Sequence, residues 1–235
     1  MMFETWLNAY TQYDWTVDLS KFKNRKNYPG FFNNIITPQN LLDFEKKFHK
    51  SIEDVNHFEV AGEVCFWKNF GTFQSRNRLT IRLLDHLKLN DHWEKFKKCI
   101  RDLSETPSYV IFDNLRKAAN QPKGFASPIT FLSFYNPSSF PMIDKNIAYW
   151  WSENKARFGY EESVNFSQRS DGWIQTYTRS QNIQNWNAYL EWTKFCCDYS
   201  KRIINLSKFN NRARDVEMAI WEAQKRGIKL TILPV

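Results

Sequence analysis

The chain has 235 residues, of which 42% are hydrophobic and 17% are aromatic. That supply is enough for the core of one full-sized domain or of two small lobes. With only 7 glycines and 8 prolines, a loop-rich all-β fold is disfavoured and a helical fold is favoured. The 33 Lys and Arg residues outnumber the 25 Asp and Glu residues, so the net charge is +8. A basic surface attracts polyanions such as nucleic acid, although Lys-rich proteins without such a partner also occur.

The four cysteines, Cys65, Cys99, Cys196 and Cys197, do not have the spacing of a metal site. The adjacent pair Cys196-Cys197 is also a poor disulfide candidate. This pattern argues against a zinc ribbon and against a four-cysteine iron–sulfur cluster, and we expect neither a metal nor an organic cofactor. The first residues do not show a basic segment followed by an apolar run, so we expect no secretory signal, and no apolar run of the sequence has membrane-spanning length. We therefore expect a cytoplasmic protein without membrane contact.

Helices are predicted for most of the first hundred residues. Thr37-Pro38 has the pattern of a helix start, with Thr as N-cap and Pro at the first helical position. The apolar residues that follow recur at helical spacing. Further helices are predicted over 52–70 and 77–89, and Asp91 is expected to cap a fourth.

Two helices joined by a short turn follow. Thr-Pro and Ser-Pro pairs open predicted helices over 107–119 and 128–135, and Pro137 stops the second. Gly124 lies in the short break between them. Two helices joined by a tight Gly-containing turn predict a helix-hairpin-helix over about 107–135.

The remaining chain is predicted to be helical on both sides of a long polar segment. A helix over 145–153 is followed by residues 157–184, which are polar and weakly periodic and therefore indicate a surface segment. Loops of this length are often functional. Two closing helices are predicted over 186–206 and 212–225, the second ended by a glycine. The tail 228–233 forms either a short strand or an extended docking arm.

A specific pattern connects the hairpin to the helix after it. Gly124 occupies the turn, and an apolar helix and the apolar connector 141–143 then lead to Asp144. Residues 120–144 resemble the hairpin-plus-aspartate signature of helix-hairpin-helix DNA glycosylases, and the pairing with endonuclease-III-like members needs no gap. The resemblance implies an all-α, two-lobed glycosylase fold in which Asp144 is the catalytic carboxylate.

The register of this resemblance has a chemical consequence. Ala126 stands where bifunctional members carry the lysine that forms a Schiff base with the sugar. Because Ala126 has no nucleophile, the chain resembles the monofunctional branch, which uses water. Lys123, on the other side of Gly124, is the alternative amine if the hairpin deviates from the family geometry.

The implied mechanism follows from what cleavage of an N-glycosidic bond demands. The breaking bond builds positive charge on the sugar, as in glycoside hydrolysis. Asp144 would stabilise that charge and orient or deprotonate water, once the target base has left the duplex. Taken alone, an Asp before a helix is more simply an N-cap. The hairpin, its spacing from Asp144 and the apolar residues directly before Asp144 favour catalysis. The capping role and the catalytic role are compatible.

The expected base pocket is aromatic. In such a pocket, aromatic rings stack on the flipped base and a side-chain amide hydrogen-bonds to its edge. The alternative role for aromatic residues is ordinary core packing. At least one of the three aromatic residues at 149–151 is expected to line the pocket. The residues assigned to the pocket are Trp67, Asn69, Phe70, Trp150 and Trp151.

Backbone amides at the start of a helix can hold a DNA phosphate, and Gly permits close approach. The residues assigned to the DNA backbone are Lys123, Gly124, Phe125, Ala126, Ser127, Arg76 and Arg78.

Two further polar segments carry alternatives. Lys208, Arg212 and Arg214 are candidate phosphate contacts. Residues 212–217 form, as the alternative, an exposed helical face with internal ion pairs, the interpretation preferred for Asp215 and Glu217. The segment 168–173 either contacts DNA or forms a solvated loop.

These features predict two lobes with an active-site cleft between them, one of residues 59–143 and one of 1–58 plus 144–235. We expect a monomer that hydrolyses a damaged or modified base from double-stranded DNA, in base-excision repair or in antiviral defence. The alternatives are a non-catalytic helix-hairpin-helix DNA-binding protein, in which Asp144 only caps a helix, and a helical interaction protein. The sequence does not identify the base.

Overall fold

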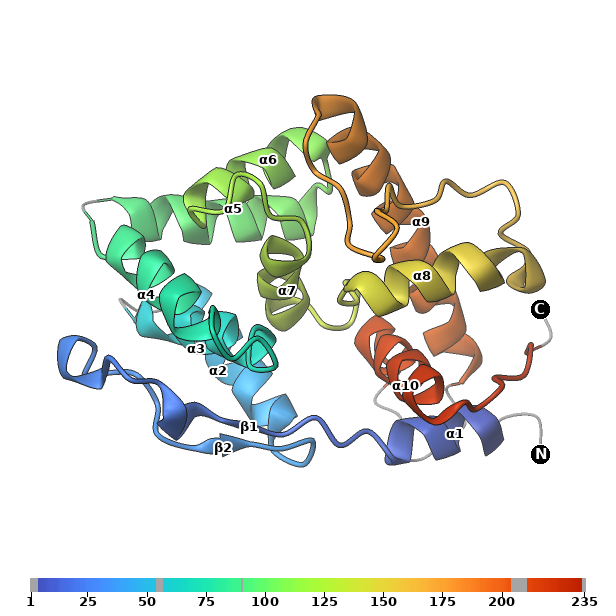
Figure 1. Ribbon diagram of the computed structural model, residues 1–235, viewed down its shortest axis with the longest axis horizontal. Coiled ribbons are helices and arrows are strands. Elements are labelled where there is room, and N and C mark those ends of the chain that lie inside the picture. The colour runs from blue at the N-terminus through green and yellow to red at the C-terminus, as the bar shows by residue number, and fades with distance from the viewer. Residues whose placement is uncertain (1–3, 54–56, 90, 204–210, 234–235) are drawn as a thin grey trace. The chain divides into compact units, whose positions relative to one another are not determined.

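The chain is mostly helical. Its described residues form ten α-helices, three 3-10 helices and two short strands, β1 (Val17–Asp18) and β2 (Ile35–Ile36), which pair antiparallel (Figure 1). The predicted all-α class is therefore confirmed for this part of the chain. The described helices include none that is both long and apolar enough to cross a membrane. The computed structural model describes residues 4–53, 57–89, 91–203 and 211–233.

The chain forms two compact units. Asp14–Asn136 forms one, here called the hairpin unit, and Met1–Tyr13 with Pro137–Val235 forms the other, the aspartate unit. The sequence-based grouping differs, since it joined residues 14–58 to the C-terminal part. Those residues contribute a helix whose Phe44 ring lies 5.3 Å from the Phe134 ring, inside the hairpin unit. An amphipathic helix shows in its sequence that it needs a partner but not which partner it has.

The hairpin unit is arranged around its last helix. Seven of the ten residues of α7 are buried, and α2, α3, α5 and α6 all contact it. The Phe131 ring lies 5.1 Å from that of Phe96, and Trp67 lies 5.1 Å from Phe134. A helix that is apolar all round is a buried one. The elements after β1 are η1 (Leu19–Lys21), η2 (Arg25–Asn27), β2, α2 (Leu41–Glu53), α3 (Glu59–Lys68), α4 (Arg76–Leu87), α5 (His92–Glu105), α6 (Tyr109–Ala118) and α7 (Ala126–Tyr135).

Several predicted helix starts are shifted in the structure. α2 begins three residues after the end of the Thr37-Pro38 pair, because Thr37 N donates to Asn40 Oδ1 at 2.7 Å in a preceding turn. Ser108, not the earlier threonine, caps α6 by accepting from Ile111 N at 3.3 Å. In the predicted helix over 52–70, α2 ends at Glu53 and α3 begins only at Glu59, while 54–56 lie outside the described residues. These boundaries depend on which side chain accepts a hydrogen bond from the unpaired backbone amides at the helix start. Several residues close together in the sequence can do so.

The aspartate unit is arranged around its C-terminal helix. α1, α8 and α9 all contact α10 (Figure 1). α9 begins seven residues earlier than predicted, at a capping box between Thr178 and Gln181. Gly227 ends α10 with a φ of 68°, as the predicted glycine stop requires. The elements are α1 (Glu4–Thr11), α8 (Lys145–Asn154), η3 (Lys155–Phe158), α9 (Arg179–Arg202) and α10 (Ala213–Arg226).

The charged start of α10 is buried, which corrects the expectation of an exposed face. Arg214 and Asp215 are 0% exposed. The predicted internal ion pairs are present: Arg212 Nη2 lies 2.6 Å from Asp215 Oδ1, and Arg214 Nη1 lies 3.2 Å from Glu217 Oε2. Buried charges require such pairing. Arg212 and Arg214 are therefore buried in ion pairs within the fold and are not phosphate contacts, while Lys208 lies outside the described residues.

The chain after α10 is an extended arm that docks on α1. Thr231 N donates to Thr5 Oγ1 at 3.1 Å, and the Trp6 indole donates to Thr231 O at 2.8 Å. No strand is formed by the described residues of this tail. Of the two predicted alternatives, the docking arm is the one observed.

Candidate functional site

The connector between α7 and α8 is anchored in the core of the aspartate unit. Pro141, Met142 and Ile143 are buried. Two side chains of α9 hold their backbone: Tyr189 Oη donates to Pro141 O at 2.9 Å, and Trp192 Nε1 donates to Met142 O at 3.0 Å. The backbone that leads to position 144 is therefore held by two side-chain hydrogen bonds from α9.

Asp144 caps α8. Its backbone is extended, with φ −142° and ψ −175°, and its Oδ1 atom accepts from Ile147 N at 2.9 Å. The sequence-based alternative of an N-cap is thus observed. This hydrogen bond holds the carboxylate in one orientation, and Asp144 remains partly exposed. A cap and a catalytic role are compatible, because the cap needs only one carboxylate oxygen.

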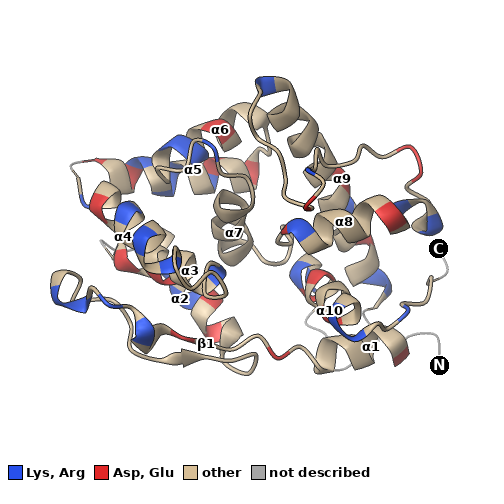
Figure 2. Cartoon of the chain, viewed as in Figure 1, with Lys and Arg blue, Asp and Glu red and all other residues tan. Residues whose placement is uncertain are grey.

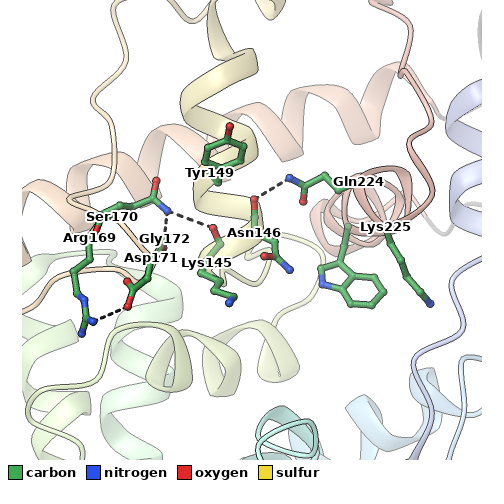
Figure 3. Close-up of a pocket in the computed structure, with 11 residues that line it drawn as sticks. Lys145, Asn146, Tyr149, Arg169, Ser170, Asp171, Gly172, Gln224 and Lys225 are labelled. Atoms are coloured by element: carbon green, nitrogen blue, oxygen red, sulfur yellow. Dashed lines mark hydrogen bonds and ion pairs between the residues drawn. The ribbon is translucent and has the colours of Figure 1, made fainter.

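The residues directly after Asp144 line a cavity of about 670 Å³ within the aspartate unit. Lys145, Asn146 and Tyr149 contribute from α8, residues 168–172 from the long polar segment, and Trp221, Gln224 and Lys225 from α10. Figure 3 shows these three segments meeting around one hollow. The volume lies within the roughly 300–1,000 Å³ typical of small-molecule sites.

Hydrogen bonds hold the three segments together. Gln168 Nε2 donates to Lys145 O at 3.3 Å and to Gly172 O at 2.7 Å, which ties the polar segment to α8 (Figure 3). Gln224 Nε2 donates to Asn146 O at 3.0 Å, which ties α10 to the same helix. The cavity is therefore framed by specific contacts.

The polar segment itself has an ordered turn over 168–174. Gln168 and Ile174 form an isolated antiparallel bridge, and Arg169 N donates to Trp173 O at 2.9 Å. Gly172 has a φ of 84°, a left-handed conformation that favours glycine. The sequence predicted a surface segment here, but its weak periodicity gave no sign of this turn.

The cavity carries an excess of positive charge. Its lining residues include three cations, Lys145, Arg169 and Lys225, and one carboxylate, Asp171. Asp171 Oδ2 lies 2.6 Å from Arg169 Nη2, and Lys225 Nζ lies 3.8 Å from Oε1 of the buried Glu222 behind the cavity wall, so among the described residues Lys145 is the lining cation without an ion pair. A cavity with this balance attracts anions.

Two of the predicted pocket tryptophans are core residues. Trp151 is 0% exposed and packs 5.7 Å from Trp192 and 5.5 Å from Phe195. Trp150 is 8% exposed and lies 5.5 Å from Phe158. Buried rings of this kind offer no face to a nucleobase. Of the aromatic residues at 149–151, Tyr149 lines the cavity and is 57% exposed.

The other three predicted pocket residues, Trp67, Asn69 and Phe70, belong to the hairpin unit. Trp67 is 3% exposed and packs on Trp15 and Phe134, the core alternative. Asn69 Nδ2 donates to Cys65 O at 2.8 Å, so its amide closes the end of α3. The Phe70 ring packs against the guanidinium of Arg76.

Arg76 stabilises a loop and is not available as a phosphate contact. It is 6% exposed, and its Nη1 atom donates to Phe70 O at 3.0 Å. Its guanidinium lies 4.5 Å from the Phe70 ring and 4.8 Å from the Phe73 ring. Arg78 is exposed on the same helix, where Figure 2 shows a row of basic residues, and lines a second cavity of about 720 Å³ with Arg82.

The predicted hairpin is present as two helices, α6 and α7, joined by residues 119–125. The Gly124 amide already donates to Gln121 O at 2.8 Å, inside the turn. Phe125 is 3% exposed and packs 5.0 Å from Phe112. Lys123 is exposed, whereas Ala126 and Ser127 are partly buried. α7 begins at Ala126, one residue before the Ser-Pro pair that was predicted to open it. A phosphate at this turn would depend on amides other than that of Gly124.

Sequence reasoning did not single out the residues that α10 brings to the cavity. Trp221 and Lys225 lie one helical turn apart, a spacing that places them on one face. The described part of the chain contains no group of three or more His, Cys, Asp or Glu side chains placed to hold a metal. Comparison of the chain with protein-family models, with curated proteins and with solved structures finds no match.

Proposed function

We propose that the protein is a monofunctional DNA glycosylase in which Asp144 is the catalytic carboxylate. One observation carries the proposal. Asp144 is a partly exposed carboxylate at the head of a helix whose first two residues line a cationic cavity, and α9 side chains hydrogen-bond the connector before it. The two-helix hairpin that precedes it, in the order and spacing of the glycosylase signature, supports the same function.

In the proposed reaction the bond between C1′ of the deoxyribose and the base nitrogen breaks, and its electron pair leaves with the base. The positive charge that develops on the sugar is stabilised by the Asp144 carboxylate. A water oxygen bonds to C1′, its proton passes to Asp144, and the departing base takes a proton from solvent. The products are a free base and an abasic site. Ala126 has no amine, so no Schiff base forms at that position.

The test is abasic-site formation on a panel of modified duplexes and modified phage genomes, revealed by alkaline strand cleavage. Asp144→Asn and Asp144→Ser remove the charge but keep a good N-cap residue, so both variants should fold and neither should cleave. Abasic sites formed by either variant at the wild-type rate would contradict the proposal. A wild-type protein that leaves every substrate intact, phage genomes included, would contradict it as well.

A non-catalytic DNA-binding protein is the second candidate, and the hydrogen bond from Ile147 N to Asp144 favours it. A purely structural N-cap makes the same bond. This candidate predicts salt-dependent DNA binding that is equal in the wild type and in Asp144→Asn, with no abasic sites in either.

A further inference from the structure

The cavity of the aspartate unit is bordered by three pairs of a cation and an aromatic ring. Lys145 Nζ lies 5.4 Å from the centre of the Trp173 ring, and Lys225 Nζ lies 5.4 Å from that of Trp221. Arg169 Nη1 donates to Tyr177 Oη at 3.4 Å. All three cations line the cavity (Figure 3).

Three aromatic rings at this site are open to solvent. Trp173 is 53% exposed, Tyr177 is 71% exposed, and Tyr149, inside the cavity, is 57% exposed. Large exposed apolar side chains that gather in one place usually mark a binding surface. Here each lies within a few residues of a cation, so the surface offers flat apolar faces and positive charge together.

We propose that this surface binds single-stranded nucleic acid, with bases stacked on Tyr149, Trp173 and Tyr177 and phosphates held by Lys145, Arg169 and Lys225. Single strands are bound by this combination, since every base has a face that stacks on an aromatic ring and every nucleotide carries one phosphate. A duplex cannot use the site in this way because its base faces are covered by their neighbours.

The extent of the surface favours several linked nucleotides over a single small ligand. Tyr149, Lys145 and Lys225 line the cavity, whereas Trp173 and Tyr177 lie outside its lining. They are connected to it through Lys145 and Arg169. A mononucleotide in the cavity would leave both outer rings without a base. A strand that crosses the cavity uses all three rings.

The site does not include Asp144, so the inference does not depend on the proposed catalysis. A protein that excises bases from a duplex exposes unpaired nucleotides, which this surface can hold. A protein without that activity can hold them equally well.

The test is a fluorescence-anisotropy titration in which the full chain is added to a labelled oligothymidylate of twelve nucleotides. Trp173→Ala and Tyr177→Ala should each weaken binding on the order of ten-fold, the usual effect of one stacked base. Trp173→Phe and Tyr177→Phe keep a ring and serve as matched controls that should bind nearly as the wild type does. Equal binding by the alanine and phenylalanine variants would overturn the proposal.

The cations are tested by salt dependence. Each phosphate contact on a single strand contributes about 0.7 to the slope of the logarithm of affinity against the logarithm of salt concentration. Lys145→Gln with Lys225→Gln should therefore lower the slope by about 1.4. Lys46→Gln, at an exposed lysine of α2, is the control and should leave the slope unchanged. An unchanged slope in the double variant would overturn the assignment of phosphates to these lysines.

Competition separates the possible ligands. Unlabelled oligothymidylate and oligouridylate should both displace the label, whereas duplex DNA of equal length and inorganic polyphosphate should compete poorly. Polyphosphate that competes as well as the oligonucleotide would show that charge alone is bound and would overturn the proposal. Asp144→Asn should bind the oligonucleotide as the wild type does, so loss of base excision and loss of strand binding are distinguishable.

Discussion

The Tyr189 hydroxyl donates a hydrogen bond of 2.9 Å to the carbonyl oxygen of Pro141, three residues before Asp144. Tyr189 is 0% exposed and belongs to α9, so a helix 48 residues away along the chain holds the backbone that leads to the proposed catalytic carboxylate. The bond makes Tyr189 a positioning residue, because it acts on Asp144 only through the connector.

Tyr189→Phe removes this hydroxyl and leaves the ring. The free energy of unfolding should fall by about 1–3 kcal/mol, since a buried carbonyl loses its partner. Base excision should slow because the carboxylate is less well held. Tyr160→Phe is the matched control: it removes a hydroxyl of the same unit that donates to Asp198 at 2.9 Å. Urea denaturation and excision rates would be compared, and an equal loss of excision in both variants would count against the positioning role.

Two neighbouring aromatic residues of α8 should behave in opposite ways. Trp151→Ala should lower the free energy of unfolding by about 3–5 kcal/mol, as for other buried large side chains. Tyr149→Ala should change it by less than about 0.5 kcal/mol, because its ring is exposed, but should weaken binding of single-stranded nucleic acid. Denaturant titration and anisotropy measure the two effects. A stable Trp151→Ala protein that has lost base excision would instead support the pocket role predicted from the sequence.

Glu63 should make stability depend on pH. Its side chain is 0% exposed, and burial raises the pKa of its carboxyl above the ordinary 4.5, against the opposing effects of Lys47 and of the Phe32 amide, each 2.7 Å away. The folded state therefore holds this proton more tightly than the unfolded state does. The resulting stabilisation is complete below pH 4.5 and is lost as the pH rises through the folded-state pKa.

Glu63→Gln removes that titration. The unfolding free energy of the wild type minus that of the variant should be constant below pH 4.5 and should decrease above it. Lys47→Met, which removes a cation that lowers the pKa, should extend the decrease to higher pH. Urea denaturation across the acid range measures both. A difference that increases with pH would show that the sign of the shift is wrong.

The cysteines should differ in reactivity. Burial raises the pKa of the Cys65 thiol to about 12 and that of Cys196 well above its usual range. Because the thiolate is the reactive form, neither should be alkylated at pH 8 until the protein unfolds. Cys99 and Cys197 are partly exposed and should react first, though slowly. Mass spectrometry after iodoacetamide treatment would locate the labels, and labelling of native Cys65 as fast as Cys197 would be contrary to the expectation.

Features set by interactions among a few adjacent residues were predicted well. The aspartate at position 144 was expected at the head of a helix, and it accepts the hydrogen bond from Ile147 N that such a cap makes. Asn136 ends α7 directly before the proline that was predicted to stop it. Gly227 ends α10. Each of these signals acts within one helical turn, so it is readable without knowledge of the rest of the chain.

The local sequence pattern did not predict which residues are buried. The Arg212 to Glu217 region has a polar sequence, yet it is buried and its charges pair with one another. Likewise Tyr149 and Trp151 are aromatic neighbours on one helix, but only the second faces α9. Which face of a helix is covered depends on partners distant in sequence, and those partners are chosen by packing of the whole unit.

The amino-acid sequence was therefore sufficient for the helical class, for several helix ends and for the position of the candidate carboxylate, because capping and periodicity are local effects. The cavity became visible only in the folded chain. Its walls come from α8, the 168–174 turn and α10, and hydrogen bonds such as Gln224 Nε2 to Asn146 O connect residues 78 positions apart. Such contacts leave no periodic trace in the sequence, since they require a specific geometry that only the packed unit provides.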